Sequence, residues 1–150
     1  MTDIEIKIER LKKLSDADID GINRILPNLT EHYDGRSVDQ EGLTKIINSP
    51  LHEQFVARDQ TGRIVGMATL TEVISIYHGS VAYLEDIFVD PDAGKCGIGS
   101  MIWSDMLDWC RERGIKRMEF TCRPERIAAT NFYIKHGCKI RKTNSFRLEI

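Results

Sequence analysis

Three glycines stand close together in the stretch DPDAGKCGIGS, which runs from Asp90 to Ser100: Gly94, Gly97 and Gly99. An ordinary turn needs one or two residues with positive φ, so three glycines indicate that a ligand approaches the backbone closely. An apolar run precedes the stretch and an amphipathic one follows it, which is typical of a strand passing into a helix. Because the first amides of a helix have no partners within the helix, this junction predicts a site for an anion such as a phosphate.

Familiar phosphate-binding patterns do not fit this loop. The Walker A pattern G-x-x-x-x-G-K-[ST] has no match, and a dinucleotide fingerprint needs a third glycine where Ile102 stands. The letters GKCG match the G-x-x-G loop of a KH RNA-binding module, but that loop joins two helices, whereas here a strand comes first. An RNA contact and a loop that only turns the chain remain as alternatives to the anion site.

Two adjacent carboxylates, Glu85 and Asp86, interrupt the apolar run VAYLEDIFV that precedes the loop. Because alternate residues of a strand face opposite sides of a sheet, we expect one carboxylate to face a cleft and the other to face away. A carboxylate that is partly shielded from water has a raised pKa, which suits a general base. A structural carboxylate bonded to backbone amides or to an arginine is the alternative for either residue.

Cys96 lies inside the same loop, at the predicted start of the helix, where a thiol ionises more readily. A nucleophilic cysteine would need a base beside it, and no histidine is near in the sequence. We therefore expect Cys96 to take no covalent part in the chemistry.

Length and composition predict one globular domain over residues 1–150. The formal net charge of −2 gives no electrostatic basis for binding nucleic acid or an anionic membrane. The four cysteines form no C-x-x-C pair, so neither a zinc ribbon nor any other metal site is expected. The N-terminal segment lacks the apolar core of a signal peptide, and a cytoplasmic location is predicted.

Periodicity predicts the elements that position these residues. Ser15 with Asp18, and Ser37 with Gln40, are spaced as capping boxes that open two helices. Gly62 is expected to have positive φ in a hairpin turn. Strands are predicted over residues 4–10, 53–59, 64–76, 81–89 and 116–122, helices over 97–113 and 126–137, and one or two further strands in 138–150. The order β-α-α-β-β-β-α-β-α-β-β describes an α/β protein with a mixed, mostly antiparallel central sheet flanked by helices.

The loop and a later helix resemble two motifs of the GNAT superfamily of N-acetyltransferases. The superfamily motif R/Q-x-x-G-x-G/A follows a central strand and opens a helix, and it reads GKCGIG here. The segment AATNFYIKHGCKI is similar to the family's last helix, usually A-x-x-F-Y-E-K-x-G-F. The similarity is strongest over residues 84–138, and the element order extends it over the chain. Gly94 replaces the usual Arg or Gln, and Arg126 replaces a frequent Asn. A narrower resemblance is to glucosamine-6-phosphate N-acetyltransferases.

The resemblance implies the GNAT acyl-CoA acyltransferase fold and transfer of acetyl from acetyl-CoA to a primary amine of a small molecule. The amine attacks the thioester directly in a ternary complex. The implied cofactor contacts lie on the central strand, in the loop and at the last helix: Ile87, Phe88, Val89, Gly94, Lys95, Cys96, Gly97, Ile98, Gly99, Ser100 and Arg126.

The resemblance also implies roles at the reacting centre. Tyr133 is the expected proton donor to the leaving thiolate, with core packing as the alternative. Glu85 is the expected base acting through water, and Asp86 is the other candidate. His32, Tyr33 and Asp34 lie in the loop that covers the acceptor pocket in this superfamily. A non-catalytic acyl-CoA sensor and an enzyme that acetylates a protein amine remain alternatives, and a homodimer is a possible assembly.

Overall fold

The computed structural model describes residues 5–30, 32–94 and 96–150. Lys95, one of the expected cofactor contacts, lies outside the described residues, as does Ile4 at the start of the first predicted strand. The chain divides into two compact units, Met1–Phe120 and Thr121–Ile150.

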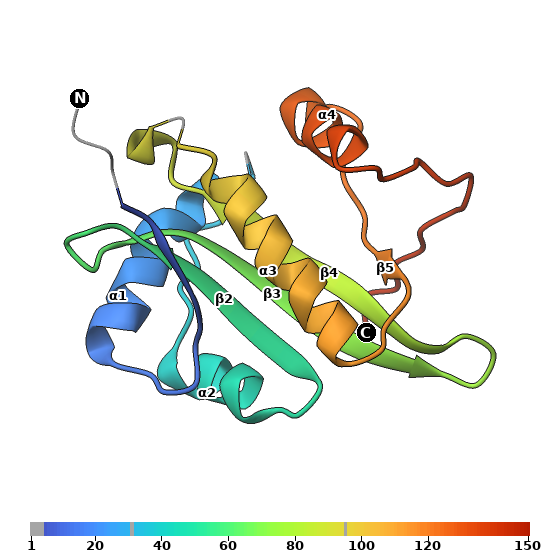
Figure 1. Cartoon of the computed structure of the whole chain (residues 1–150), viewed down its shortest axis with the longest axis horizontal. Helices are drawn as coiled ribbons and strands as arrows, with labels where there is room; N and C mark the ends of the chain where they lie inside the picture. The colour runs from blue at the N-terminus through green and yellow to red at the C-terminus, as the bar shows by residue number, and fades with distance from the viewer. Residues whose placement is uncertain (1–4, 31, 95) are drawn as a thin grey trace. The chain divides into compact units, whose positions relative to one another are not determined.

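The first unit is built on a five-stranded sheet in the order β1-β2-β3-β4-β5 (Figure 1). β1 to β4 pair in antiparallel fashion, and β5 runs parallel to β4. The prediction of a mixed, mostly antiparallel sheet with flanking helices is confirmed. The strands are β1 (Lys7–Arg10), β2 (His52–Arg58), β3 (Ile64–Ser75), β4 (Gly79–Val89) and β5 (Met118–Glu119).

Helices α1 (Asp16–Ile25) and α2 (Gln40–Asn48) start at polar residues that cap them. Ser15 and Asp18 form the predicted capping box of α1. The predicted cap of α2 at Ser37 is wrong: Asp39 directly precedes the first turn and accepts from the Gly42 amide at 2.6 Å. The helical segments are α1 (Asp16–Ile25), η1 (Leu26–Asn28), α2 (Gln40–Asn48), η2 (Pro91–Ala93) and α3 (Ile98–Glu112).

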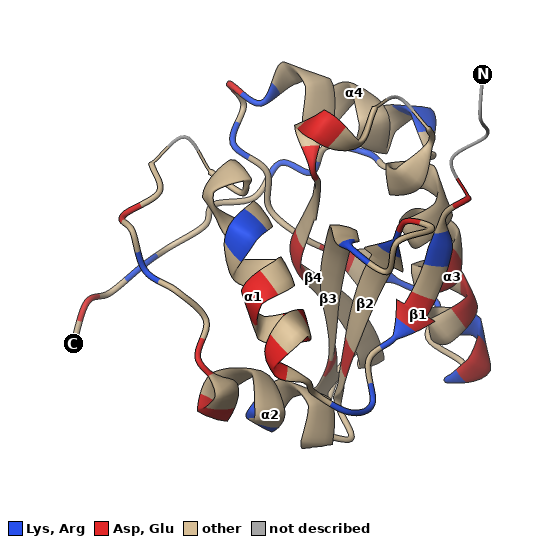
Figure 2. Ribbon diagram, turned by 90° about the vertical axis from the view of Figure 1, so that its left-hand side faces the viewer, with Lys and Arg blue, Asp and Glu red and all other residues tan. Residues whose placement is uncertain are grey.

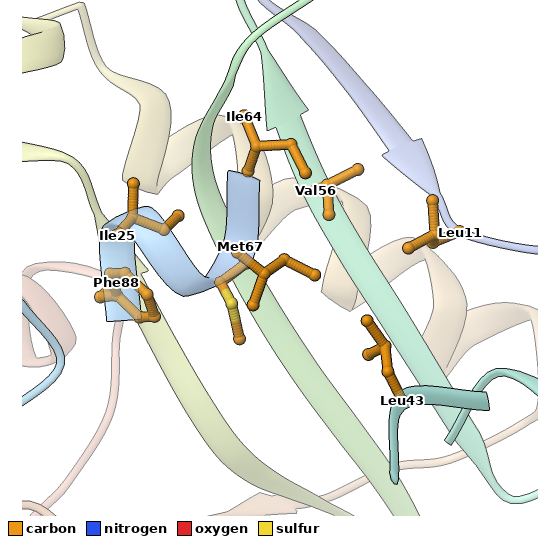
Figure 3. Packing of buried hydrophobic residues seen from close by; sticks show 8 residues of the cluster. Leu11, Ile25, Leu43, Val56, Ile64, Met67 and Phe88 are labelled. Atoms are coloured by element: carbon orange, nitrogen blue, oxygen red, sulfur yellow. The ribbon is translucent and has the colours of Figure 1, made fainter. Parts of the chain in front are cut away.

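Apolar side chains cover both faces of the sheet. One core cluster joins α1 and α2 to the strands through buried residues, several of which are shown in Figure 3: Leu11, Ile22, Ile25, Leu43, Val56, Ile64, Met67 and Phe88. Helix α3 packs on the opposite face, above Gly66. A Cβ at Gly66 would lie 3.0 Å from Ile102 Cδ1 and 3.2 Å from Ile98 Cγ2, so the glycine lets the start of α3 approach the sheet closely.

The second unit contains α4 (Ile127–Lys135) and a tail without regular secondary structure. The strands predicted within residues 138–150 are not formed, although all these residues are described. Phe146, Leu148 and Ile150 alternate as in a strand, yet each is at least 83% exposed. A strand is stabilised by backbone hydrogen bonds to a neighbouring strand, and this segment pairs with none. Alternation of apolar residues alone therefore does not make it a strand. No helix in the described part of the chain is long and apolar enough to cross a membrane.

Candidate active site

A β-bulge lies in β4 at the two predicted carboxylates. Thr69 of β3 faces Asp86, but the next residue, Leu70, faces Leu84, so Glu85 is left without a partner residue. A bulge bends the strand and re-aims the side chains beside it. Glu85 is exposed there and accepts from the Thr71 hydroxyl at 3.3 Å.

Asp86 differs from Glu85 in its surroundings. It is partly buried, and this burial raises the pKa of its carboxyl, with a further contribution from the charge of Glu85. The two adjacent carboxylates therefore have different environments: one is open to water and one is partly removed from it.

Beyond the bulge, one edge of β4 lacks a strand. On one side, Ile87, Phe88 and Val89 pair with β3. On the other side, β5 pairs with β4 at Ala82 and Tyr83, and no pairing beyond Tyr83 is found among the described residues. The backbone groups of the last part of β4 on this side are thus available to an extended ligand that adds as a strand.

The glycine loop follows directly on this open edge. Gly94 has φ 78° and Gly97 has φ 70°, values that L side chains rarely adopt, so glycine is required at both positions. A Cβ at Gly97 would meet nothing within 4 Å, which leaves open space over the backbone. Helix α3 starts at Ile98, and no side chain caps its N-terminus. The uncapped amides of its first turn suit an anion.

Cys96 of this loop is exposed, and its thiol lies 3.7 Å from the Ala93 carbonyl oxygen. Cys110 of α3 is buried, and burial raises its pKa. Among the described residues, no group of His, Cys, Asp and Glu is arranged to hold a metal ion.

The three predicted acceptor-site residues lie together in the segment between η1 and α2. The His32 amide donates to Thr30 Oγ1 at 3.2 Å, and the Tyr33 hydroxyl donates to the Arg36 carbonyl oxygen. Arg36 also pairs with Asp34, and this hydrogen-bonded guanidinium lowers the pKa of the Asp34 carboxyl. Each of these contacts is local, so they shape the loop itself.

Tyr133 and Arg126 belong to the second unit, on α4 and at its N-cap. Burial raises the pKa of the Tyr133 phenol, and the nearby thiols of Cys122 and Cys138 act in the same direction, whereas Arg126 opposes them. The Tyr133 ring contacts Phe132 edge-on at 5.6 Å between centroids. This environment keeps the phenol protonated at neutral pH, as a proton donor requires.

One residue of the first unit that sequence patterns did not single out is Asp90, directly after β4. Its carboxylate is 2% exposed and bonds to Arg24, Arg63 and the Asp92 amide. Burial raises its pKa, but the hydrogen bonds and the two guanidinium charges outweigh that effect and hold the pKa below its usual value. The sequence feature that could have pointed to Asp90 is its position directly before the glycine loop.

Charged residues of both signs are interspersed along the elements (Figure 2). In the ribbon, α1 and α3 each carry acidic and basic segments. This pattern differs from the basic surface that an RNA-binding module presents.

A mixed sheet with an open strand edge, followed by a glycine loop at a helix N-terminus, defines an α/β protein that can bind an extended, phosphate-bearing ligand. The model of the acetyltransferase (GNAT) family matches residues 23–138 of this chain. The protein therefore belongs to the GNAT acetyltransferase family, and the resemblance seen in the sequence is confirmed.

Solved structures of similar fold include several acetyltransferases. An aminoglycoside acetyltransferase from an uncultured soil metagenomic sample superposes with a TM-score of 0.81 at 23% identity, covering 97% of this chain and 96% of that one. An acetyltransferase of Trypanosoma brucei gives 0.76 at 23% identity, covering 97% and 100%. AAC(6')-Iy, solved with the bisubstrate analogue CoA-S-monomethyl-acetylneamine, gives 0.75 at 17% identity, covering 97% and 99%. At these identities the similarity establishes the fold.

Proposed function

We propose that the protein is an acetyl-CoA-dependent N-acetyltransferase whose acceptor is a primary amine of a small molecule. The observation that carries this proposal is the open edge of β4, which ends in the uncapped glycine loop. Backbone groups of residues 87–89 bind the pantetheine arm as an added strand, and the amides of residues 96–100 bind the pyrophosphate. Arg126, which belongs to the second unit, stays a predicted contact of the donor.

The chemistry proceeds without a covalent enzyme intermediate. Glu85, acting through a water molecule, takes a proton from the acceptor ammonium, with Asp86 as the second candidate for this role. The free amine then attacks the thioester carbonyl, and a β4 backbone amide stabilises the oxyanion. As the C–S bond breaks, Tyr133 gives its proton to the leaving thiolate. The attacking nitrogen loses its second proton to solvent, and Tyr133 regains one from solvent, so that the products are the amide and the CoA thiol.

An aminoglycoside is the first acceptor to test, because two of the similar folds are described with aminoglycoside or neamine chemistry. We propose that His32, Tyr33 and Asp34 contact the acceptor, since they cluster in one exposed segment after η1. Asp34 is paired with Arg36, which lowers its pKa, so an acceptor ammonium group binds this carboxylate in competition with Arg36.

The test is turnover of acetyl-CoA, followed by thiol release, with a panel of aminoglycosides, polyamines, amino sugars and a peptide N-terminus. Acceptor-dependent thiol release supports the proposal. Tight CoA binding without turnover for any amine would instead indicate a non-catalytic acyl-CoA module.

The single domain over residues 1–150, the homodimer and the cytoplasmic location stay predictions. Light scattering of the purified chain tests the dimer.

A further inference from the structure

The point where β4 passes into the glycine loop is fixed by one buried carboxylate. Asp90 is 2% exposed and accepts three hydrogen bonds. Arg24 Nη1 donates to its Oδ2 at 2.6 Å, Arg63 Nη2 donates to the same oxygen at 3.0 Å, and the Asp92 amide donates to Oδ1 at 3.0 Å. Its own amide donates to the Val65 carbonyl oxygen at 2.8 Å.

The partners of Asp90 come from separate parts of the first unit. Arg24 lies in the last turn of α1, and its Nη2 also donates to the Ile64 carbonyl oxygen at 2.5 Å. Arg63 lies in the turn between β2 and β3. The third partner, Asp92, lies in η2, the first part of the loop itself. One side chain thus ties the start of the loop to a helix and a hairpin that belong to the packed core.

We propose that Asp90, Arg24 and Arg63 form a clamp that positions the glycine loop for the donor's phosphates. The inference rests on the proposed function, because it assumes that this loop binds acyl-CoA. All three are positioning residues, since they act through the loop.

The physical need for such a clamp follows from the loop's composition. A segment with glycines at positive φ has many conformations available, and ordering it on binding costs affinity. A charge-assisted anchor at the first residue of the loop restricts those conformations before the ligand arrives. Loss of the anchor is therefore expected to weaken donor binding while leaving the reacting groups in place.

A second ion-pair cluster in the same unit provides a matched control. Arg58 of β2 bonds to Glu9 at 2.9 Å, to Asp18 at 2.6 Å and to the Gly62 carbonyl oxygen at 3.2 Å. It ties α1 to the sheet as Arg24 does, but none of these contacts reaches residues 90–97. If Arg24→Gln and Arg58→Gln lose comparable stability, a difference between their CoA affinities comes from the position of the loop and not from general destabilisation.

The experiment measures CoA affinity by calorimetry, together with melting temperature and the steady-state constants for acetyl-CoA, in the full chain. Arg24→Gln and Asp90→Asn are expected to raise the Kd for CoA and the KM for acetyl-CoA about tenfold, the effect of losing one charge-assisted hydrogen bond, with kcat within about twofold. Arg58→Gln is expected to lower the melting temperature and leave Kd and KM unchanged. Arg24→Lys, which keeps the charge, is expected to restore part of the affinity.

Three outcomes overturn the inference, at different levels. If the wild-type chain binds CoA and Arg24→Gln and Asp90→Asn bind it equally well, the clamp has no role in donor binding. An equal loss of affinity in Arg58→Gln also overturns it, because the effect then follows stability alone. If the wild-type chain binds no CoA, the proposed function fails, and the clamp's role in donor binding fails with it.

Discussion

The two units hold their candidate site residues in different ways. In the first unit, the exposed glycine loop is held at both ends by buried residues: Phe88 is 7% exposed, Asp90 is 2% exposed and Ile98 is 2% exposed. In the second unit, which runs from Thr121 to Ile150, no residue falls in the buried class, and Tyr133 lies on the short helix α4. The proposed function therefore gives donor binding to a packed unit and proton donation to a unit in which no residue is buried.

Because of this difference, substitutions in the two units are expected to change different properties of the protein. Changes at residues that anchor the glycine loop in the first unit, such as Asp90, are expected to act on donor affinity and on folding stability together, because these residues serve both. Changes at Tyr133 are expected to act on rate with little effect on either. The predictions below test this separation, beginning with the largest expected effect.

Tyr133→Phe is expected to lower kcat by roughly 10²- to 10⁴-fold, the range typical of losing a general acid. The substitution removes one hydroxyl and keeps the ring, so the melting temperature and the Kd for CoA should barely change. Steady-state kinetics, calorimetry and a melting curve on the same preparation check this. Tyr77→Phe is the matched control, because Tyr77 lies at the tip of the β3–β4 hairpin and is 89% exposed. Full activity of Tyr133→Phe would show that the thiolate obtains its proton elsewhere.

Gly99→Val is expected to raise the Kd for CoA by about 10- to 100-fold, because a branched side chain in the first turn of α3 blocks close approach of the pyrophosphate to the amides. Gly97→Val should have a similar effect on affinity but also lower stability, since Gly97 has φ 70°. Calorimetry measures how far each valine blocks the CoA pyrophosphate, and melting curves measure the backbone strain that only Gly97→Val is expected to add. Unchanged affinity in both variants would exclude the loop as the pyrophosphate site.

Local patterns predicted most of the first unit, because the signals there are local. The strand segments of β2 to β4, the capping box at Ser15 and the positive φ of Gly62 depend on neighbouring residues, and the structure has them. The tail shows the limit of such patterns: residues 146–150 alternate correctly, but a strand forms only if another strand is available. The sequence of a segment does not show whether another strand will lie beside it.

The candidate site shows the same division. The glycine loop and the carboxylates of β4 were visible in the sequence, since glycine spacing and a charged pair in an apolar run are local features. The bulge at Glu85 depends on register with β3, and the bonds of Asp90 to Arg24 and Arg63 join residues far apart in the chain. Neither was predicted, because tertiary packing decides both.

Glu85→Gln is expected to lower kcat/KM at neutral pH by about tenfold, less than the roughly 10²- to 10⁴-fold typical of a general base, because Glu85 acts through water. The loss should shrink as the pH is raised, because a larger fraction of the acceptor amine is already deprotonated and needs no base. Rate profiles of wild type and variant from about pH 6 to 10 check this against the ordinary pKa range of amines. A constant ratio across the range would show that Glu85 does not handle the acceptor's proton. Thr71→Val, which removes the hydroxyl donor to Glu85, is the milder companion variant.

Asp86→Asn is expected to have the smallest effect and to raise stability at neutral pH. Burial raises the pKa of Asp86 in the folded state above its unfolded value, so the folded protein holds an ionised carboxylate at a cost. Below the unfolded pKa the group is protonated in both states and contributes nothing. The cost sets in as the pH rises from the unfolded to the folded pKa, and it is complete above the latter.

The stability gain of Asp86→Asn should therefore be full above the folded pKa and vanish on acidification through that window. The gain should appear as a rise in the melting temperature that is lost at acidic pH. Asp90→Asn is the control of opposite sign: its pKa is lowered, so its carboxylate stabilises the fold above the unfolded pKa, and this contribution disappears as the pH falls through the folded pKa. Urea unfolding of both variants at several pH values measures the two trends. A loss of stability at pH 7 in both variants would show that Asp86, like Asp90, is held by bonds that favour its charge, and that it is a structural carboxylate unsuited to act as a base.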